Sequence, residues 1–165
     1  MFDRYIRWRH SRGFGIHSPS AYRLIREVLC PSSRYGYYSY ASLEGYVNRD
    51  WLLRDLRLLC RLLVDFHPDK VYAGRESRLV PLVKELLPAA EITRDAQSAD
   101  FALIDSAPLP SSSTGITTIF IHGNPSGVLP ALTAGMTGGH VFVSLRNALV
   151  VNRSTLPFQT FRLNF

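Results

Sequence analysis

The stretch DKVYAGRESRL, residues 69–79, decides the fold that we expect for this chain. Its first half is a short apolar run typical of a buried β-strand, Gly74 provides a turn, and a helical pattern follows. Many α/β proteins hold a nucleotide-like cofactor where a strand, a glycine turn and a helix follow one another. This turn is unusual because it has one glycine and two arginines, Arg75 and Arg78.

The residues that follow predict a parallel sheet with crossover helices, because short apolar runs alternate with helical or loop segments. The runs are KVYAG, EITR, DFALID and TTIFIHG, and the helical segments are SRLVPLVKELL and PSGVLPALTAGM. Two long β-rich runs end the chain, GHVFVSLRNALVVNR and PFQTFRLNF, separated by the turn STL. We expect them to form an antiparallel pair. The predicted fold is therefore α/β, with a mostly parallel sheet of about six strands that closes with an antiparallel hairpin.

Helical patterns precede the sheet. In SPSAYRLIREVL, Ser18 is a good N-cap and Pro19 fits the first helical position. A further helix, DWLLRDLRLLCRLLVDF, ends before Pro68. We expect residues 1–66 to form an N-terminal helical segment packed on the body, and residues 67–165 to form a Rossmann-like domain in the same structural unit.

The positive charge is concentrated at the N-terminus. The net charge is +6, and residues 1–34 contribute +5 of it, with seven arginines against Asp3 and Glu27. The segment FDRYIRWRHSR predicts a short helix with an aromatic face and a basic face. Such a helix is compatible with a solvated surface, with packing on the body or on a second subunit as a homo-oligomer, and with contact to nucleic acid. It contains no recognised nucleic-acid-binding motif.

The other composition signals exclude several classes of protein. Cys30 and Cys60 lack the spacing of a metal site or a disulfide framework, so we expect two buried structural thiols. No apolar run is long enough for a transmembrane helix, and the N-terminus lacks the apolar core of a signal peptide. We expect a cytoplasmic protein without membrane contact.

Four segments carry a resemblance to a known family. They are GIHSPSAYRLIREVL, RLLCRLLVDFHPDKVYAG, ADFALIDSAP and HVFVSLRNALVVNRSTLPFQTFRLNF. They are similar to a bacterial branch of the class I S-adenosylmethionine-dependent methyltransferases, in which a Gly-x-His-Ser-Pro-Phe motif leads into a first helix. Ser20 stands where that motif has Phe. The resemblance covers most of the chain, and the His-Ser-Pro part is its distinctive element.

The resemblance implies S-adenosylmethionine as the cofactor, and this sequence departs from the family pattern at two places. The family has an acidic residue in the first strand, followed by two spaced glycines. Here Gly74 matches the first glycine, Tyr72 takes the acidic position and Arg78 takes the second glycine position. In addition, only residues 96–98 separate EITRD from ADFALID, where the family has a further strand and helices that help build the adenosine pocket. Such a short link requires EITR to be a short edge strand.

Four residues at expected strand ends are candidates for a site, since ligands of such folds bind at the carboxyl ends of the strands. The resemblance implies cofactor binding by Gly74, Asp95 and Asp105, and His122 is a candidate general base. Each has an alternative structural interpretation: turn geometry for Gly74, a solvated loop for Asp95, capping of the next turn for Asp105, and packing for His122. We expect no metal site.

Three functional hypotheses remain open. The first is an active methyltransferase on an unknown acceptor. The second is a degenerate, methyltransferase-like protein with weak or no catalysis that acts as a binding or assembly module. The third is a binder of small molecules or nucleic acid that reuses the crevice.

Overall fold

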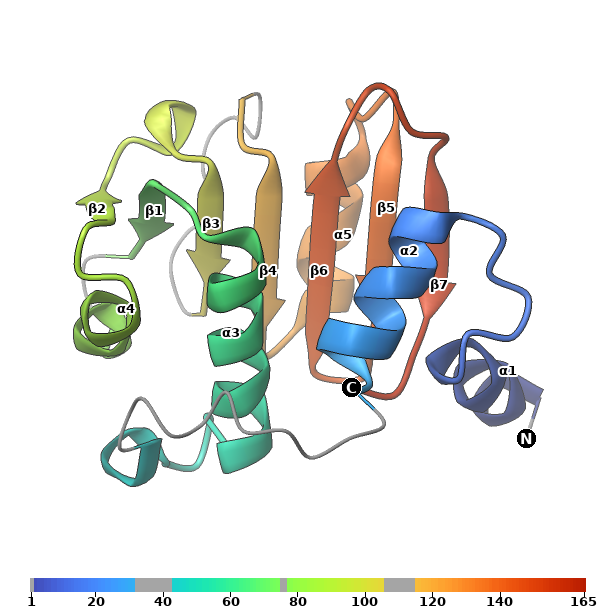
Figure 1. Cartoon of the computed structure of the whole chain (residues 1–165), viewed down its shortest axis with the longest axis horizontal. Helices are drawn as coiled ribbons and strands as arrows, with labels where there is room; N and C mark the ends of the chain where they lie inside the picture. Colours follow the sequence, from blue (N-terminus) through green and yellow to red (C-terminus); the bar gives the residue numbers. More distant parts are fainter. Residues whose placement is uncertain (1, 32–42, 75–76, 106–114) are drawn as a thin grey trace. The chain divides into compact units, whose positions relative to one another are not determined.

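A seven-stranded mixed sheet is the main element of the computed structural model, which describes residues 2–31, 43–74, 77–105 and 115–165 (Figure 1). Arg75 and most of the tyrosine-rich connector lie outside these residues. The chain divides into two units. The helical unit comprises Met1–His67, Arg78–Ala89 and Arg162–Phe165, and the sheet unit comprises Pro68–Ser77 and Ala90–Phe161.

The sheet combines a parallel half and an antiparallel half. Its strands are β1 (Lys70–Ala73), β2 (Glu91–Thr93), β3 (Phe101–Ile104), β4 (Thr118–His122), β5 (Gly139–Val143), β6 (Asn147–Asn152) and β7 (Gln159–Arg162). Their order is β2-β1-β3-β4-β6-β5-β7. The pairs β1–β2, β1–β3 and β3–β4 are parallel, whereas β6 is antiparallel to both β4 and β5. The expected α/β class and parallel strands are confirmed.

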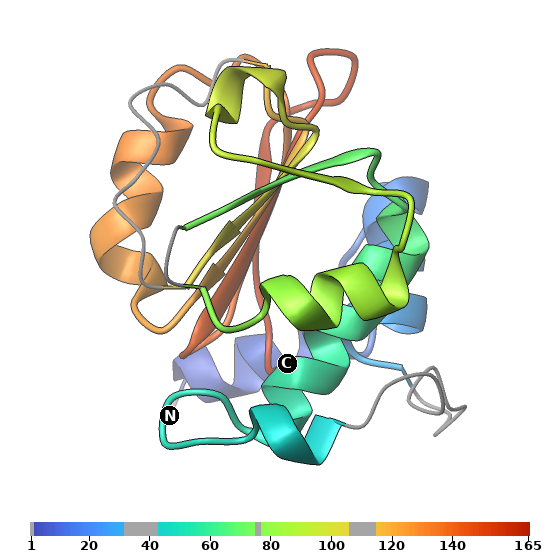
Figure 2. The same ribbon diagram turned by 90° about the vertical axis from the view of Figure 1, so that its left-hand side faces the viewer.

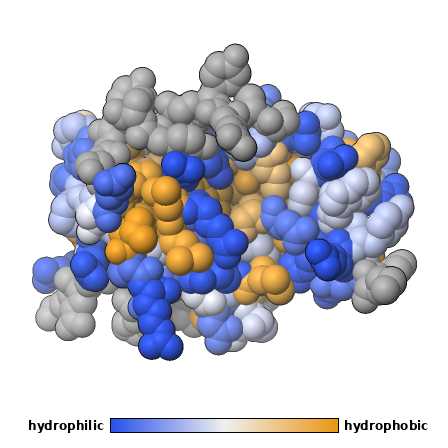
Figure 3. Space-filling view, turned by 90° about the horizontal axis from the view of Figure 1, so that it is seen from below, coloured by the Kyte–Doolittle hydropathy of each residue, from blue (hydrophilic) through white to orange (hydrophobic). Residues whose placement is uncertain are grey.

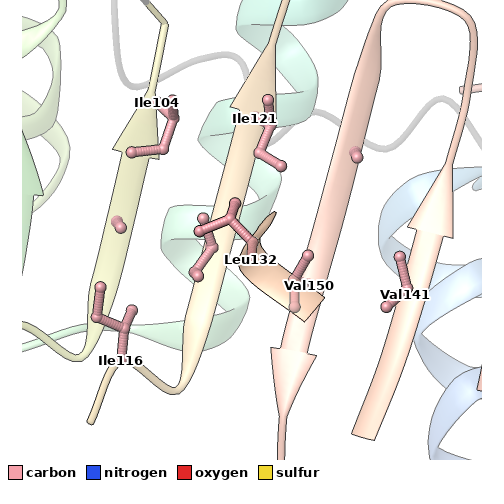
Figure 4. Packing of buried hydrophobic residues seen from close by; sticks show 9 residues of the cluster. Ile104, Ile116, Ile121, Leu132, Val141 and Val150 are labelled. Carbon is pink, nitrogen blue, oxygen red and sulfur yellow. The ribbon is translucent and has the colours of Figure 1, made fainter. Parts of the chain in front are cut away.

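One face of the sheet packs against α5 (Pro125–Thr133), as Figure 2 shows. In Figure 4 the side chains of Ile104, Ile121 and Val150 come from three neighbouring strands, and Leu132 of α5 lies among them. Residues of the opposite face are also buried, including Phe101, Phe120 and Phe142. Strands buried on both faces read as continuous apolar runs, which is why these runs could be recognised in the sequence.

The end of the sheet differs from the prediction. About six strands and one closing pair were expected, but the described residues form a sheet of seven strands, and the run 139–153 is itself a hairpin of β5 and β6. The hydroxyl group of Ser144 donates to the carbonyl oxygen of Asn147 (3.0 Å) and accepts from its backbone N–H (3.0 Å). These bonds stabilise the turn between β5 and β6, two strands that are equally apolar. The final strand β7 then lies beside β5 rather than β6.

The helical unit begins as the sequence indicates. Its segments are α1 (Phe2–Ser11), α2 (Pro19–Arg23), the π-helical η1 (Leu24–Leu29), the 3₁₀ turn η3 (Leu43–Tyr46), α3 (Leu53–Phe66) and α4 (Val80–Leu86). The Ser18 hydroxyl accepts the N–H of Ala21 (3.4 Å), and Pro19 opens α2, so the predicted cap is confirmed. Helix α3 ends where His67 adopts a left-handed conformation (φ 43°) just before Pro68.

Within the helical unit, α1 is docked on the chain's last residues. The Arg7 guanidinium donates to the carbonyl oxygen of Leu163 (3.2 Å), and the Ser11 hydroxyl accepts the N–H of Asn164 (2.8 Å). Asp3 accepts hydrogen bonds from Arg7 (2.8 Å) and Arg162 (2.9 Å), which lower the pKa of its carboxyl group. The basic N-terminal helix therefore has a defined position on residues 162–164.

The surface in Figure 3 carries hydrophobic side chains among hydrophilic ones, as folded proteins generally do. Within the described residues, no helix combines the length and the apolar character needed to cross a lipid bilayer.

Candidate functional site

The strand order places the four predicted site residues along one edge of the sheet, here called the carboxyl edge. Asp95 comes shortly after β2, Gly74 directly after β1, Asp105 directly after β3, and His122 ends β4. The four strands are parallel and stand in the order β2-β1-β3-β4, so their carboxyl ends share this edge. Ligands of α/β sheets bind at such an edge, where successive connections diverge. Here that point lies between β1 and β3.

A hydrogen bond spans this point. The backbone N–H of Ser77 donates to the carbonyl oxygen of Gly74 (3.1 Å), the residue directly after β1. The hydroxyl group of the buried Ser77 then donates to Oδ2 of Asp105 (2.8 Å). Asp105 is thus held by a protein group where a ligand of the carboxyl edge would approach. Ser77 was not predicted as a site residue, because nothing in the sequence indicates that the turn carrying it reaches the end of β3.

His122 belongs to a buried polar pair. Its Nδ1 lies 2.6 Å from Oδ1 of Asn147, and both side chains are almost inaccessible to solvent. The two residues are register partners on the antiparallel strands β4 and β6. Burial of a polar group requires such a partner, because an unmade hydrogen bond in the interior is costly. This geometry favours the structural interpretation of His122 over the role of an exposed general base.

Asp105 and His122 both come at the ends of neighbouring parallel strands. The register of β3 and β4 ends with the pair Ile104 and Ile121, and each of the two polar residues follows its strand's member of that pair directly. Each has a partner supplied by another part of the chain, Ser77 for Asp105 and Asn147 for His122.

Asp95 has a local role. It follows β2 at the sheet edge, is exposed, and its Oδ1 accepts the N–H of Gln97 (3.0 Å). This bond caps the 3₁₀ turn η4 (Ala96–Ser98), which links β2 to β3. The short link is thus possible in the way the sequence required, with β2 as a three-residue edge strand.

The two departures from the family pattern have structural counterparts. Tyr72 of β1 is partly buried and packs against the apolar cluster beneath α5, so its position is used for packing. Arg78 is exposed, and α4 begins only at Val80, six positions after Gly74. In nucleotide-binding folds the glycine turn runs directly into a helix whose N-terminus faces the ligand. Here Ser77, whose backbone N–H bonds to Gly74, stands between the glycine and the start of α4.

Groups that suit a metal ion are not gathered in the described part of the chain, where no three His, Cys, Asp or Glu residues come together. Cys60 is buried and Cys30 half-buried, and burial raises the pKa of both thiols, that of Cys60 to about 11. Nucleophilic thiols need a lowered pKa, so neither cysteine has the character of a reactive one.

Comparison of the sequence with protein-family models, with curated proteins and with solved structures finds no significant match.

Proposed function

We propose that the chain is an S-adenosylmethionine-dependent methyltransferase-like protein whose cofactor site is degenerate, with weak or no catalysis, and which acts as a binding or assembly module. The α/β sheet supports this proposal, because its parallel strands are followed in the sequence by strands with antiparallel pairing, as in the family that the chain resembles. The observation that carries the degenerate form is the hydrogen bond between Ser77 and Asp105. This bond engages the carboxylate of Asp105 at the carboxyl edge, where ligands of such folds bind.

The two signature positions at which the chain departs from the family pattern, 72 and 78, also favour a degenerate cofactor site. A carboxylate at position 72 would face the cofactor in the family pattern, whereas Tyr72 contributes to the core. A glycine at position 78 would leave room for close approach of a ligand, whereas Arg78 carries a long charged side chain. The chain thus resembles the family more in its fold than in the residues of the cofactor site.

An active methyltransferase is the second candidate. It is favoured by the placement of Asp95, Gly74, Asp105 and His122 on one edge, in the order of their strands. In this form Asp105 would exchange its bond from Ser77 for a cofactor group.

Calorimetric titration and thermal shift with S-adenosylmethionine and S-adenosylhomocysteine test both candidates. A ligand at 100 times its Kd stabilises a protein by about 2.7 kcal/mol, which a melting curve detects. The degenerate form predicts no shift at millimolar cofactor. Saturable binding that is lost in Asp105→Asn but kept in Asp69→Asn, a carboxylate just before β1, would contradict it and support the active form.

Restoration of the family pattern is the sharper experiment. If decay of the signature explains weak binding, Tyr72→Glu with Arg78→Gly should bind the cofactor better than the wild type. Tyr72 packs in the core, so circular dichroism must first show that the double variant folds. Arg78→Gly alone is the second variant, because Arg78 is exposed and its replacement leaves the core intact. Unchanged binding in two folded variants would remove the signature as the cause.

A further inference from the structure

Aromatic rings and arginines gather on one surface of the helical unit. Tyr5 and Trp8 of α1, and Phe14 just after it, have exposed fractions of 54%, 45% and 55%. Arg9 and Arg12 lie among them and are also exposed. We call these five residues the aromatic–arginine surface. Large aromatic side chains are normally buried, so three exposed ones within ten residues indicate a surface that contacts something.

The rings and guanidinium groups are arranged as flat platforms. The rings of Tyr5 and Trp8 are stacked, with centroids 6.1 Å apart and planes 20° from parallel. The guanidinium carbon of Arg12 lies 4.5 Å from the centroid of Trp8, and that of Arg9 lies 5.9 Å from the centroid of Tyr5. These contacts hold planar cations beside planar rings, where cation–π attraction and stacking both operate.

A hollow of about 200 Å³ lies beside these platforms. Its lining consists of Tyr5, Ile6, Arg9, His10, Phe14 and Gly15. Phe14 lies between Gly13 and Gly15, whose φ values of 81° and 77° favour glycine, and its backbone N–H donates to the carbonyl oxygen of Arg9 (3.0 Å). A Cβ atom on Gly13 would overlap the ring of Tyr22 on α2, so the loop packs closely there. Phe14 is therefore exposed on a well-defined turn.

The charge of this surface calls for an anionic partner. The two acidic residues among residues 1–34 are already paired: Asp3 with Arg7 and Arg162, and Glu27 with Arg23 (3.6 Å). Besides Arg7, α1 and the residue that follows it carry Arg4, Arg9 and Arg12, of which Arg9 and Arg12 lie beside the rings. Phosphate binding by arginine releases counterions and is favoured wherever such charge is concentrated.

We propose that the aromatic–arginine surface binds single-stranded nucleic acid. Bases stack on the exposed rings of Tyr5, Trp8 and Phe14, and Arg9 and Arg12 contact the phosphates. Base stacking on aromatic side chains tolerates any sequence, because every base has a π-face. This inference concerns the helical unit and is independent of cofactor binding at the carboxyl edge.

Two other occupants fit the observations less well. A second copy of the chain would bring two surfaces of the same positive charge together. An anionic membrane favours helices with a broad apolar face, whereas Ile6 is the single aliphatic residue between Asp3 and Gly15, and it is half-buried. Stacked rings interleaved with arginines suit unpaired bases and phosphates better.

Fluorescence anisotropy with a labelled oligothymidylate tests the proposal. Tyr5→Ala and Trp8→Ala should each weaken binding about five- to 150-fold. Arg9→Gln with Arg12→Gln should reduce the slope of log K against log salt by about 1.4, since each phosphate contact on a single strand contributes about 0.7. The matched controls are Phe158→Ala, another exposed ring, and Arg49→Gln with Arg94→Gln, exposed arginines elsewhere.

Intrinsic fluorescence provides a second measurement. The chain has two tryptophans, of which Trp8 is exposed and Trp51 is only 6% exposed. The oligonucleotide should quench Trp8, and the quenching should disappear in Trp8→Phe while affinity is largely kept, because Phe also stacks. The conservative variant keeps the test valid if Trp8→Ala proves unstable.

Three results would overturn the proposal. The first is the absence of oligonucleotide binding at low salt. The second is an equal loss of affinity in the control variants. The third is cosedimentation with phosphatidylserine vesicles that depends on the same side chains in a protein that does not bind the oligonucleotide, which would identify the surface as a membrane contact.

Discussion

The hydroxyl group of Ser77 lies 2.8 Å from Oδ2 of Asp105, and this bond joins the segment that follows β1 to the residue that follows β3. Two neighbouring parallel strands are thereby tied together at the point where their connections diverge. A ligand that uses Asp105 must compete with this bond or extend it. The carboxyl edge is therefore stabilised by hydrogen bonds between the protein's own groups. Substitutions that remove one of these groups are expected to lower the free energy of unfolding.

Ser77→Ala should lower the free energy of unfolding by about 1 kcal/mol, the usual contribution of one such hydrogen bond. Ser77 is buried, so its hydroxyl group cannot be replaced fully by solvent. Urea denaturation provides the measurement. Ser126→Ala is the matched control, because that hydroxyl bonds the exposed Asn124 (3.0 Å) and its loss should cost less. An equal loss of unfolding free energy in the two variants would show that the bond of Ser77 contributes no more than an exposed one.

Asn147→Leu should destabilise the protein by about 1–3 kcal/mol, because it removes the buried partner of His122 while keeping a branched side chain of the same number of heavy atoms. His122→Leu should have a similar cost. In a double-mutant cycle the combined variant should lose less than the sum of the two single losses, since the interaction disappears only once. Additive losses would mean that the two side chains do not depend on one another.

Gly139→Ala should cost at least about 2 kcal/mol. Gly139 has φ of 120°, and a Cβ atom there would overlap the carbonyl oxygen of Val151 on the partner strand. Gly135→Ala is the control, because a Cβ atom at position 135 meets no atom within 4 Å. Its effect should stay within about 0.5 kcal/mol. Thermal melts of the two variants provide the comparison, and similar melting temperatures would contradict the strained geometry.

Stability should fall as the pH drops below about 6.5, in part through His140. Burial lowers the pKa of His140 from its ordinary value of 6.5. Between the two pKa values the unfolded chain binds more protons than the folded one, so stability is complete above 6.5 and is lost towards the lower, folded pKa. His140 packs edge-on against Phe142 and Phe161, at 6.0 and 5.7 Å between ring centroids.

The variant His140→Phe isolates this contribution. It keeps an aromatic ring in the cluster and removes the titratable group, so its urea midpoint should change less between about pH 7.5 and about pH 5.5 than that of the wild type. The same change in the two proteins would assign the pH dependence to other groups.

Neither thiol should react quickly in the folded protein. With a pKa of about 11, Cys60 is thiolate in only about one molecule in a thousand at pH 8, and its side chain is buried. Cys30 donates to the carbonyl oxygen of Asn164 (3.4 Å), and burial also raises its pKa. Ellman's reagent should therefore label two thiols rapidly only in guanidinium chloride. Rapid labelling of the native Cys30→Ser variant would contradict the burial of Cys60.

The sequence predicted most of the parallel half of the sheet, because its strands are short apolar runs bounded by turns. KVYA, FALI and TIFIH lie within the runs that the pattern indicates, and Ser18 caps α2 as expected. The hairpin at Ser144 was missed for a physical reason. The runs on its two sides are equally apolar, and the turn is closed by the backbone N–H and the hydroxyl group of Ser144, both bonded to the backbone of Asn147.

The sequence predicted where the candidate site residues lie along the strands, but not which side chains they contact. Strand ends can be read from the sequence, so Gly74, Asp105 and His122 could be assigned to one edge once the strands were parallel. Their partners Ser77 and Asn147 come from other segments, 28 positions from Asp105 and 25 positions from His122. No local pattern specifies such pairs, because they depend on strand order and register.

The docking of α1 on residues 162–164 has a consequence for synthesis on the ribosome. The hydrogen bonds that fix this helix join residues 153 to 159 positions apart. During translation α1 is made more than 150 residues before the segment that binds it. The hydrogen bonds that hold α1 in place can therefore form only after residues 162–164 have been made. The docking of this helix thus depends on contacts of very high sequence separation, which form slowly compared with local ones.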